Sequence, residues 1–270
     1  RAGHQVSVAE AREELGGRVS REARIKGLAA WGRVRDYRLY QLRQMANVSL
    51  YPASPLDAEG VADFAADHVL LATGSRWLAD GRGRSRLSPI PGFSGVALTP
   101  DDVLDDAKLA TDVVIYDDDH YYMANALAAD LAAKGHRVQI VSPQPTLAPW
   151  MGHTLEQPRM IAELMAAGVQ MYPNCTARGW TPEGLTVIRS DTGASLPTVT
   201  GASLIHVGIR HPDVKLSQDL TDRGIGHSLI GDAESPGIIQ SAVYSGHRHA
   251  RELLGQVPEG HFLRERAEIL

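Results

Sequence analysis

Acidic and glycine residues that follow short apolar runs are the residues of this sequence best suited to hold a cofactor. Glu10 follows the run QVSVA, and a Gly-Gly-Arg segment follows at residues 16 to 18. In parallel α/β folds an acidic residue at such a strand end accepts hydrogen bonds from ribose hydroxyls, and glycine lets the backbone approach a phosphate closely. The spacing therefore predicts that this segment borders a dinucleotide.

Two further strand ends carry the same residue types. Ala72-Thr73-Gly74 follows the run HVLL, and Gly231-Asp232 follows the run HSLI. Because the carboxyl ends of parallel strands meet at one edge of a sheet, we expect these turns to line the same cofactor, with Asp232 near its pyrophosphate or ribityl hydroxyls. The predicted cofactor-binding residues are Glu10, Gly16, Gly17, Arg18, Ala72, Thr73, Gly74, Gly231 and Asp232.

A second dinucleotide-binding frame spans residues 113 to 141, but its turn is acidic. The run DDDHYYM, which begins at Asp117, replaces the glycines that a pyrophosphate needs, and no glycine occurs between Val113 and Lys134. Each like-charge pair about 5 Å apart would cost on the order of 1 to 3 kcal/mol. We therefore predict that NADH and NADPH do not bind this turn, and that its carboxylates cap the helix that follows from Ala124.

Metal binding and catalysis are not predicted for this chain. A calcium loop that began at Asp117 would need Gly at its sixth position and Glu at its twelfth, where the sequence has Tyr122 and Ala128. His247 and His249 lie two apart on a predicted helix, so they point to different sides. No nucleophile with a supporting base is evident either.

Composition narrows the class of protein. The chain has 270 residues, 43% of them hydrophobic, with a net charge of -5. Neither a nucleic-acid footprint nor an apolar run of membrane-spanning length is present. The single cysteine, Cys175, excludes a cysteine-ligated iron-sulfur cluster within this chain. We expect a cytoplasmic protein with small-molecule or protein partners.

The alternation of apolar strand patterns with helical patterns predicts an α/β fold. Strands are expected near residues 3 to 9, 68 to 74, 112 to 116, 203 to 208 and 227 to 233, with amphipathic helices between them. This predicts two Rossmann-like three-layer domains, the second inserted into the first. The first comprises residues 1 to 100 and 211 to 270, and the second residues 101 to 210. The chain opens at Arg1 in what looks like a helix end, so we expect the glycine fingerprint of the first domain upstream of it.

Several short motifs together carry a family resemblance. They are RDYR at 35 to 38, LATGSRW at 71 to 77, PIPG at 89 to 92, LTPDDVL at 98 to 104, KGHRVQIVS at 134 to 142, HTLEQP at 153 to 158, IGDAESP at 230 to 236 and GHRHARE at 246 to 252. Through these motifs the chain resembles the C-terminal nucleotide-binding domains of the trimethylamine dehydrogenase family. This family includes dimethylamine and histamine dehydrogenases and related N-demethylases.

The resemblance implies a flavin-dependent amine dehydrogenase or N-demethylase of which this chain is only the C-terminal part. Both domains would resemble the FAD and NAD(P)-binding domains of disulfide reductases, with FAD or ADP in the first. A missing N-terminal barrel would carry FMN and a [4Fe-4S] cluster and would oxidise the amine. Electrons would pass to an electron-transferring flavoprotein, and the full-length enzyme would be a homodimer. The identity of the amine stays open.

Two other functions remain compatible with the sequence. The domains can instead be a non-redox scaffold, in which a structural ADP supports dimerisation or the docking of an electron acceptor. The chain can also belong to an NADPH-dependent enoyl reductase of the old yellow enzyme type. The acidic turn that starts at Asp117 disfavours this last interpretation.

Overall fold

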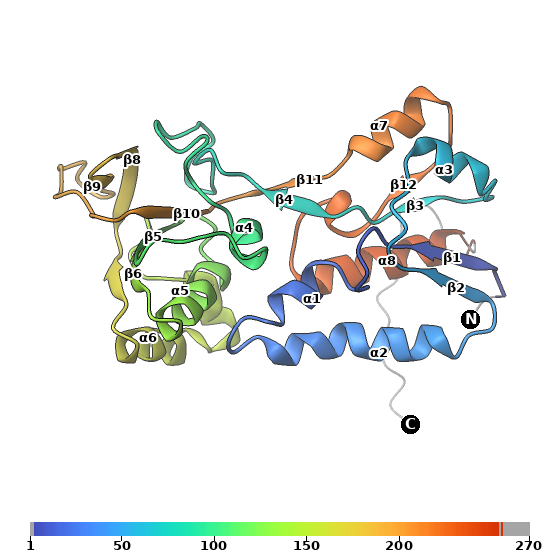
Figure 1. Ribbon diagram of the computed structural model, residues 1–270, viewed down its shortest axis with the longest axis horizontal. Coiled ribbons are helices and arrows are strands. Elements are labelled where there is room, and N and C mark those ends of the chain that lie inside the picture. Colours follow the sequence, from blue (N-terminus) through green and yellow to red (C-terminus); the bar gives the residue numbers. More distant parts are fainter. Residues whose placement is uncertain (1–2, 254, 256–270) are drawn as a thin grey trace. The chain divides into compact units, whose positions relative to one another are not determined.

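The computed structural model describes residues 3 to 253 and residue 255. The chain divides into two compact units, whose helices and strands are labelled in Figure 1. Unit 1 comprises residues 1 to 54 and 76 to 211, and unit 2 comprises residues 55 to 75 and 212 to 270. None of the helices in the described part of the chain is long and apolar enough to cross a membrane.

Unit 1 is built on a four-stranded parallel sheet with the order β10-β5-β6-β7. Its strands are β5 (Asp112–Asp117), β6 (Arg137–Val141), β7 (Gln170–Tyr172) and β10 (Ser203–Val207). Residues 113 to 116 of β5, with the sequence VVIY, are fully buried, as expected for a strand covered on both faces. From β5 the chain continues to β6 and β7 on one side, whereas β10 pairs with β5 on the other. The strand order therefore reverses between β5 and β10.

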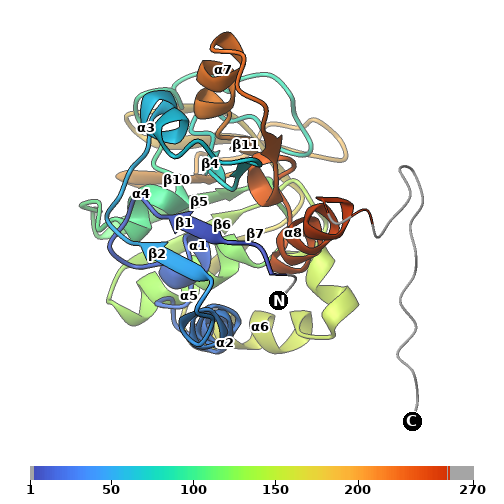
Figure 2. The ribbon, with the colours of Figure 1, turned by 90° about the vertical axis from the view of Figure 1, so that its right-hand side faces the viewer.

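Helices cover one face of this sheet (Figures 1 and 2). They are α4 (Pro100–Leu104), α5 (Met123–Ala133) and α6 (Gln157–Ala166). The alanine-rich α5 packs closely through Leu127, Ala128 and Leu131 against strand residues such as Ile115. The helix stops before Gly135, whose φ of 94° lies in the left-handed region that glycine tolerates.

A hairpin and an extended segment cover the other face. The antiparallel strands β8 (Cys175–Thr181) and β9 (Gly184–Arg189) join residues 90 to 97 in a second apolar cluster. Its centre includes Phe93, Tyr116 and Leu185, which are completely buried. Side chains packed on both faces thus hold β5 in place, so the position of its carboxyl end within the unit is well defined.

The N-terminal part of unit 1 forms smaller elements. β1 (Val6–Ala9) pairs in parallel with β2 (Val48–Tyr51), and between them lie α1 (Arg18–Glu22), the 3-10 turn η1 (Ala29–Trp31) and α2 (Gly32–Arg43). Val6 is 41% exposed and Tyr51 is 40% exposed, although parallel sheets are usually covered on both faces. This pair therefore carries apolar surface that nothing in the described residues covers.

Unit 2 is smaller and mainly helical. It contains α3 (Ala58–Asp63), α7 (Lys215–Asp222), the 3-10 turn η3 (Gly231–Ala233) and α8 (Ile239–Leu253). The short strands β3 (Leu70–Leu71) and β12 (Ser228–Leu229) pair in parallel. Val61, Leu71 and Leu220 form its core. A further pair, β4 (Ser75–Trp77) with β11 (Arg210–Pro212), lies at the residues where the chain passes between the units.

The predicted fold class is wrong. Instead of two Rossmann-like three-layer domains, one inserted into the other, the described residues contain one multi-stranded parallel sheet, that of unit 1. Every other strand belongs to a two-stranded pair, and the strands predicted at 68 to 74 and 227 to 233 shrink to Leu70–Leu71 and Ser228–Leu229. Apolar periodicity shows where a strand forms, but it does not show how many strands join one sheet.

Candidate functional site

The three aspartates of the acidic turn after β5 form their contacts with other groups of this chain. Asp117 is fully buried, and its Oδ1 accepts the backbone N–H of Asp119 at 3.2 Å and that of His120 at 3.0 Å. The N-cap of α5 is Tyr122, and no side chain caps this helix. The expectation that the aspartates cap the helix is therefore wrong, because Asp117 closes its own turn instead. Burial raises the pKa of Asp117 to about 7, and its Oδ2 has no hydrogen-bond partner among the described residues.

The other two aspartates are paired within the same unit. Asp118 is also fully buried, and its Oδ1 lies 2.9 Å from Nε2 of His120. The same oxygen accepts the backbone N–H of Ser85 at 3.0 Å. Oδ1 of Asp119 accepts a hydrogen bond from Nη2 of Arg84 at 2.9 Å. All three carboxylates are thus engaged by the protein.

A neutral histidine on β10 and a tyrosine on β5 lie opposite each other near the ends of their strands. His206 is fully buried, and its Nδ1 donates to the carbonyl of Leu78 at 2.8 Å, since a carbonyl can only accept. Burial lowers the pKa of His206 and raises that of Tyr116, which stacks on its ring at 6.0 Å between centroids. Nε2 of His206 and the hydroxyl of Tyr116 have no hydrogen-bond partner in the described part of the chain.

Four of the predicted cofactor residues lie in unit 1, where Glu10 directly follows β1. Its Oε1 accepts the backbone N–H of Arg12 at 3.0 Å. Gly16 has a φ of 116°, which favours glycine, and a β-carbon there would also lie 2.5 Å from Oγ of Ser20. Gly17 differs, because a β-carbon there would meet no atom within 4 Å.

The fourth residue, Arg18, is held by an acidic partner. Its guanidinium contacts both carboxylate oxygens of Asp101, at 2.9 and 3.3 Å, and lies 5.9 Å from the ring centre of Trp77. Arg21 donates to the same carboxylate at 2.9 Å and to the Asp101 carbonyl at 2.8 Å. Asp101, which sequence patterns did not single out, therefore fixes α1 through two arginines.

A buried carboxylate was also missed. Glu22 is 2% exposed, and its Oε2 accepts the hydroxyl of Tyr122 at 2.7 Å. Burial raises the pKa of Glu22 and that of Tyr122. Trp31 packs edge-on against the Tyr122 ring, 4.5 Å between centroids. The local sequence does not show that Glu22 is buried, because RVSRE is typical of a charged helix on the surface.

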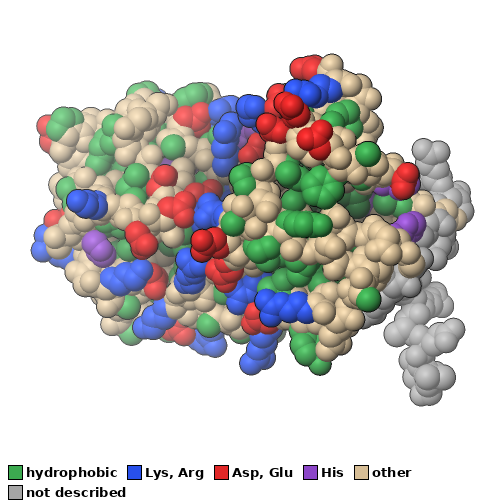
Figure 3. Space-filling view, turned by 45° about the vertical axis from the view of Figure 1, so that its right-hand side comes forward, with side chains coloured by type: hydrophobic (Ala, Val, Ile, Leu, Met, Phe, Trp, Pro, Cys, Tyr) green, Lys and Arg blue, Asp and Glu red, His purple; other side chains and the backbone are tan. Residues whose placement is uncertain are grey.

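Beside Gly17 the surface of unit 1 forms a hollow that is rich in charge. It is lined by Arg12, Glu13, Glu14, Gly17, Ser20, Arg21 and Arg24. Two of its basic side chains already form ion pairs, Arg24 with Glu14 at 2.6 Å and Arg21 with Asp105 at 2.7 Å. Figure 3 shows the same mixture of acidic and basic side chains over much of the face that it presents. The hollow is polar and nearly balanced in charge.

The other five predicted residues lie in unit 2, at the ends of two paired strands. Leu71 of β3 is in register with Leu229 of β12, so the turns that follow them leave the same edge. Oγ1 of Thr73 donates to the Asp213 carbonyl at 2.5 Å, and Gly74 has a φ of 82°. Ala72 is exposed.

In the second of these turns Asp232 stabilises the local backbone. Its Oδ2 accepts the hydroxyl of Ser75 at 3.0 Å, and its Oδ1 accepts the N–H of Gly237 at 3.0 Å. Gly231 has a φ of 61° and donates to Oγ of Ser245 at 3.0 Å. Within unit 2 the fold thus brings residues 72 to 74 and 231 to 232 to one edge. Among the described residues no three His, Cys, Asp or Glu side chains are grouped to hold a metal ion.

Known proteins that are similar to this chain are named as oxidoreductases of amines. A family model described as the OYE-like second alpha/beta domain matches residues 98 to 179. Dimethylamine dehydrogenase of Hyphomicrobium sp. (strain x) is 30% identical over 95% of this chain and 39% of its own length. Histamine dehydrogenase from Rhizobium sp. 4-9 is 37% identical, with a TM-score of 0.91 over 99% of this chain and 43% of the other.

A third relative is also named as an enzyme that oxidises an amine. The 6-hydroxypseudooxynicotine amine oxidase from Pseudomonas geniculata N1 is 37% identical, with a TM-score of 0.88 over 91% of this chain and 38% of the other. The chain thus spans about two fifths of the length of each relative. These matches support the resemblance to the amine dehydrogenases and confirm that the chain is related to oxidoreductases. The description of the family model likewise departs from the predicted pair of Rossmann-like domains.

Proposed function

We propose that this chain is part of a flavin-dependent amine dehydrogenase or N-demethylase, an oxidoreductase that acts on C–N bonds. The observation that carries this proposal is the match to histamine dehydrogenase, at 37% identity over 99% of this chain. The remaining part of the relative's length leaves room for a barrel with FMN and a [4Fe-4S] cluster, where the amine would be oxidised. The exposed apolar side chains of Val6 and Tyr51 also suit a surface that further residues of a longer protein cover.

For the cofactor of this part we propose FAD or ADP. Glu10 is only partly buried at the end of β1, where a carboxylate can accept from ribose hydroxyls. Gly17 and Gly74 each face space in which a β-carbon would meet nothing, so a phosphate can approach their backbones. Asp232 already accepts two hydrogen bonds, but a carboxylate offers about four acceptor positions. The hydride acceptor for oxidation of the carbon next to the amine nitrogen would be the FMN of the proposed barrel and not this nucleotide.

Arg18 would act on the cofactor differently from the other residues. Its guanidinium is paired with Asp101. We therefore propose that Arg18 supplies a fixed positive charge beside the dinucleotide and does not bind a phosphate directly. Asp101 would then be a positioning residue for the Gly17–Arg18 backbone. In this view α1 is held in place before the cofactor binds.

The full-length protein tests this function. Acid extraction followed by chromatography of the released nucleotide identifies FAD or ADP, and turnover is measured with a panel of amines and an artificial electron acceptor. We expect turnover of at least one primary, secondary or tertiary amine, and faster turnover with an electron-transferring flavoprotein as acceptor. Extraction of neither nucleotide, together with no turnover of any amine, would contradict the proposal. Sedimentation tests the proposed homodimer of the cytoplasmic enzyme.

A reductase of the old yellow enzyme type is the second candidate. The family model on residues 98 to 179 favours it, since its description names that class. Such an enzyme would oxidise NADPH while it reduces an activated alkene. Asp118 already contacts His120 and Asp119 already pairs with Arg84, so neither His120 nor Arg84 is available to a phosphate, which is why we rank this candidate second.

A further inference from the structure

The carboxyl edge of the four-stranded sheet has a place where ligands usually bind. In open parallel sheets, ligands occupy the crevice outside the strand ends where the strand order reverses. In unit 1 that point lies between β5 and β10. The residues there are Asp118 after β5 and Gly208 after β10.

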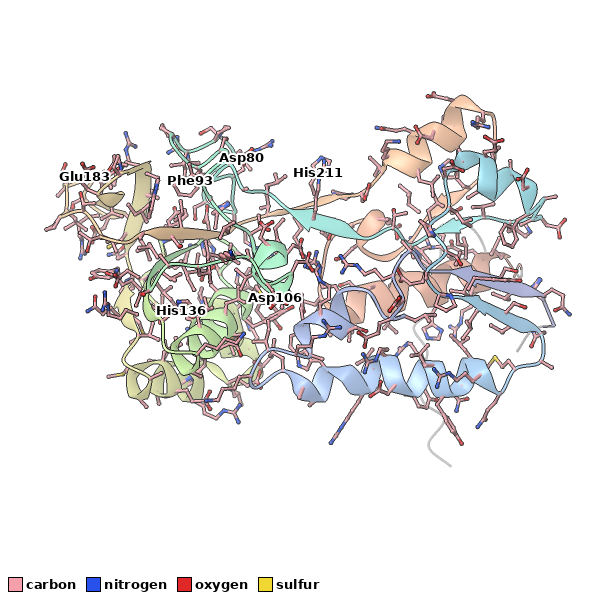
Figure 4. All side chains as sticks on the ribbon, in the orientation of Figure 1. Asp80, Phe93, Asp106, His136, Glu183 and His211 are labelled. Carbon is pink, nitrogen blue, oxygen red and sulfur yellow. The ribbon has the colours of Figure 1, made fainter. Side chains whose placement is uncertain are left out.

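A segment of the chain already occupies this point. Residues 82 to 86, here called the strap, lie between β4 and α4, on the segment that also carries the labelled residues Asp80 and Phe93 in Figure 4. The Asp118 carbonyl accepts the N–H of Arg84 at 2.9 Å, and the N–H of Ile209 donates to the Arg82 carbonyl at 3.3 Å. The strap is therefore hydrogen-bonded to the residues that follow both strands.

Two glycines make this fit possible. Gly83 is buried, and a β-carbon on it would lie 2.1 Å from Oδ2 of Asp118. On the other side, a β-carbon on Gly208 would lie 2.3 Å from the carbonyl oxygen of Arg82. Neither glycine has a φ in the left-handed region, so backbone conformation does not require them. Close contact between the strap and the strand ends does.

The charges of the strap complement those of the turn. Nε of Arg84 donates to the Asp119 carbonyl at 2.7 Å, and its Nη2 donates to Oδ1 of Asp119 at 2.9 Å. The N–H of Ser85 donates to the buried carboxylate of Asp118. The aspartates that would repel a phosphate are thus the groups that bind the strap.

We propose that the strap is a built-in occupant of the ligand position in this unit. It takes the place that a dinucleotide would have between β5 and β10, and it fastens the ends of the two strands together. The polarity of a nucleotide site is reversed, because here the turn supplies the negative charge and the occupant supplies the cation and the N–H donors. This site is consequently closed to NADH and NADPH by occupancy as well as by charge.

Amide hydrogen exchange on the unmodified full-length protein tests the occupancy. The amides of Arg84 and Ser85 should exchange as slowly as those of β5, because each donates to Asp118. Addition of NADH should leave their exchange unchanged. Exchange at the rate of an open loop would overturn the proposal, and so would an NADH-dependent change at residues 83 to 85 or 117 to 121.

Two glycine variants test the fit, with trypsin as the probe, since the strap contains Arg82, Arg84 and Arg86. Gly83→Ala and Gly208→Ala should each raise the rate of cleavage within the strap at least about tenfold, because proteolysis follows the population of the open form. Gly152→Ala is the matched control, since the nearest atom to its β-carbon would be 3.8 Å away. If both variants are cleaved at the rate of the unmodified protein, the proposal that the strap fills this position is refuted. If a variant unfolds altogether, the exchange experiment decides.

Discussion

The carboxylate of Asp118 and the imidazole of His120 lie 2.9 Å apart, and both side chains are buried. His120 has a φ of 65°, a left-handed conformation that a non-glycine residue adopts at some cost. The turn accepts this strain to bring the ring back onto the carboxylate two residues earlier. The pair therefore holds together the turn that a nucleotide site would leave open for its ligand.

Removal of one member of this pair should destabilise unit 1. We predict that Asp118→Ala lowers the free energy of unfolding by about 3 kcal/mol, because the change removes the buried partner of the His120 ring and leaves the Ser85 N–H without its acceptor. Urea denaturation followed by circular dichroism measures the loss. Asp191→Ala removes an exposed partner of Arg189 and should change stability little. Equal effects of both variants would contradict the account.

The buried Asp117 should make stability depend on pH. Its pKa rises from an ordinary value of 3.8 to about 7, so the folded protein binds a proton there that the unfolded chain releases above about pH 4. The stabilisation from this proton is complete below pH 3.8 and is lost as the pH rises through about 7.

Asp117→Asn isolates this effect, because the amide imitates the protonated carboxyl and keeps its oxygen acceptor. We predict that the variant is more stable than the unmodified protein at pH 8, by on the order of a few kcal/mol, and that the difference disappears near pH 4. Thermal melting across this range measures it. A difference that stays constant with pH would show that Asp117 is charged in the folded protein.

The hydrogen bond between Tyr122 and Glu22 should stabilise unit 1 as well. Tyr122→Phe leaves Oε2 of the buried Glu22 without its donor, which should cost about 1 to 3 kcal/mol. Glu22→Gln should cost less, because an amide oxygen can still accept from the tyrosine and the desolvated charge is gone. Denaturation of the two single variants and the double variant measures the coupling, which should be clearly non-zero.

The proposed role of Glu10 in nucleotide binding can be separated from stability. Glu10→Gln in the full-length protein should weaken retention of FAD or ADP about tenfold, as expected for the loss of a charge-assisted hydrogen bond. Its melting temperature without nucleotide should stay unchanged. Glu59→Gln, an exposed acid in the first turn of α3, is the control. Unaltered nucleotide content in the Glu10 variant would remove Glu10 from the site.

Much of the local structure could be predicted from the sequence. The apolar run of β5, the alanine-rich α5 and its glycine stop are local features, and the structure confirms a strand at Asp112–Asp117 and a helix at Met123–Ala133. Larger arrangements could not be predicted. Strand order depends on pairings between distant residues such as Val113 with Ser203, and no periodicity within one segment encodes them.

The site shows the same limit. The acidic turn that begins at Asp117 is visible as a charge run, whereas Arg84, the partner of Asp119, lies 35 residues before Asp119 in a loop without a motif. Asp101 and Glu22 escaped notice because their roles arise from contacts with Arg21 and Tyr122 that form only on folding. The glycines of residues 16 and 17 looked equivalent in sequence, yet a β-carbon would lie too close to Ser20 at the first and would meet no atom within 4 Å at the second.

Anaerobic reduction of the bound flavin in the full-length protein tests the proposed function most directly. The visible absorbance of the flavin is followed after mixing with dimethylamine, histamine or another amine of the panel, and separately with NADPH. The account predicts that at least one amine bleaches the flavin within the time of turnover and that NADPH does not. Rapid bleaching by NADPH with no response to any amine would contradict it and would favour the reductase.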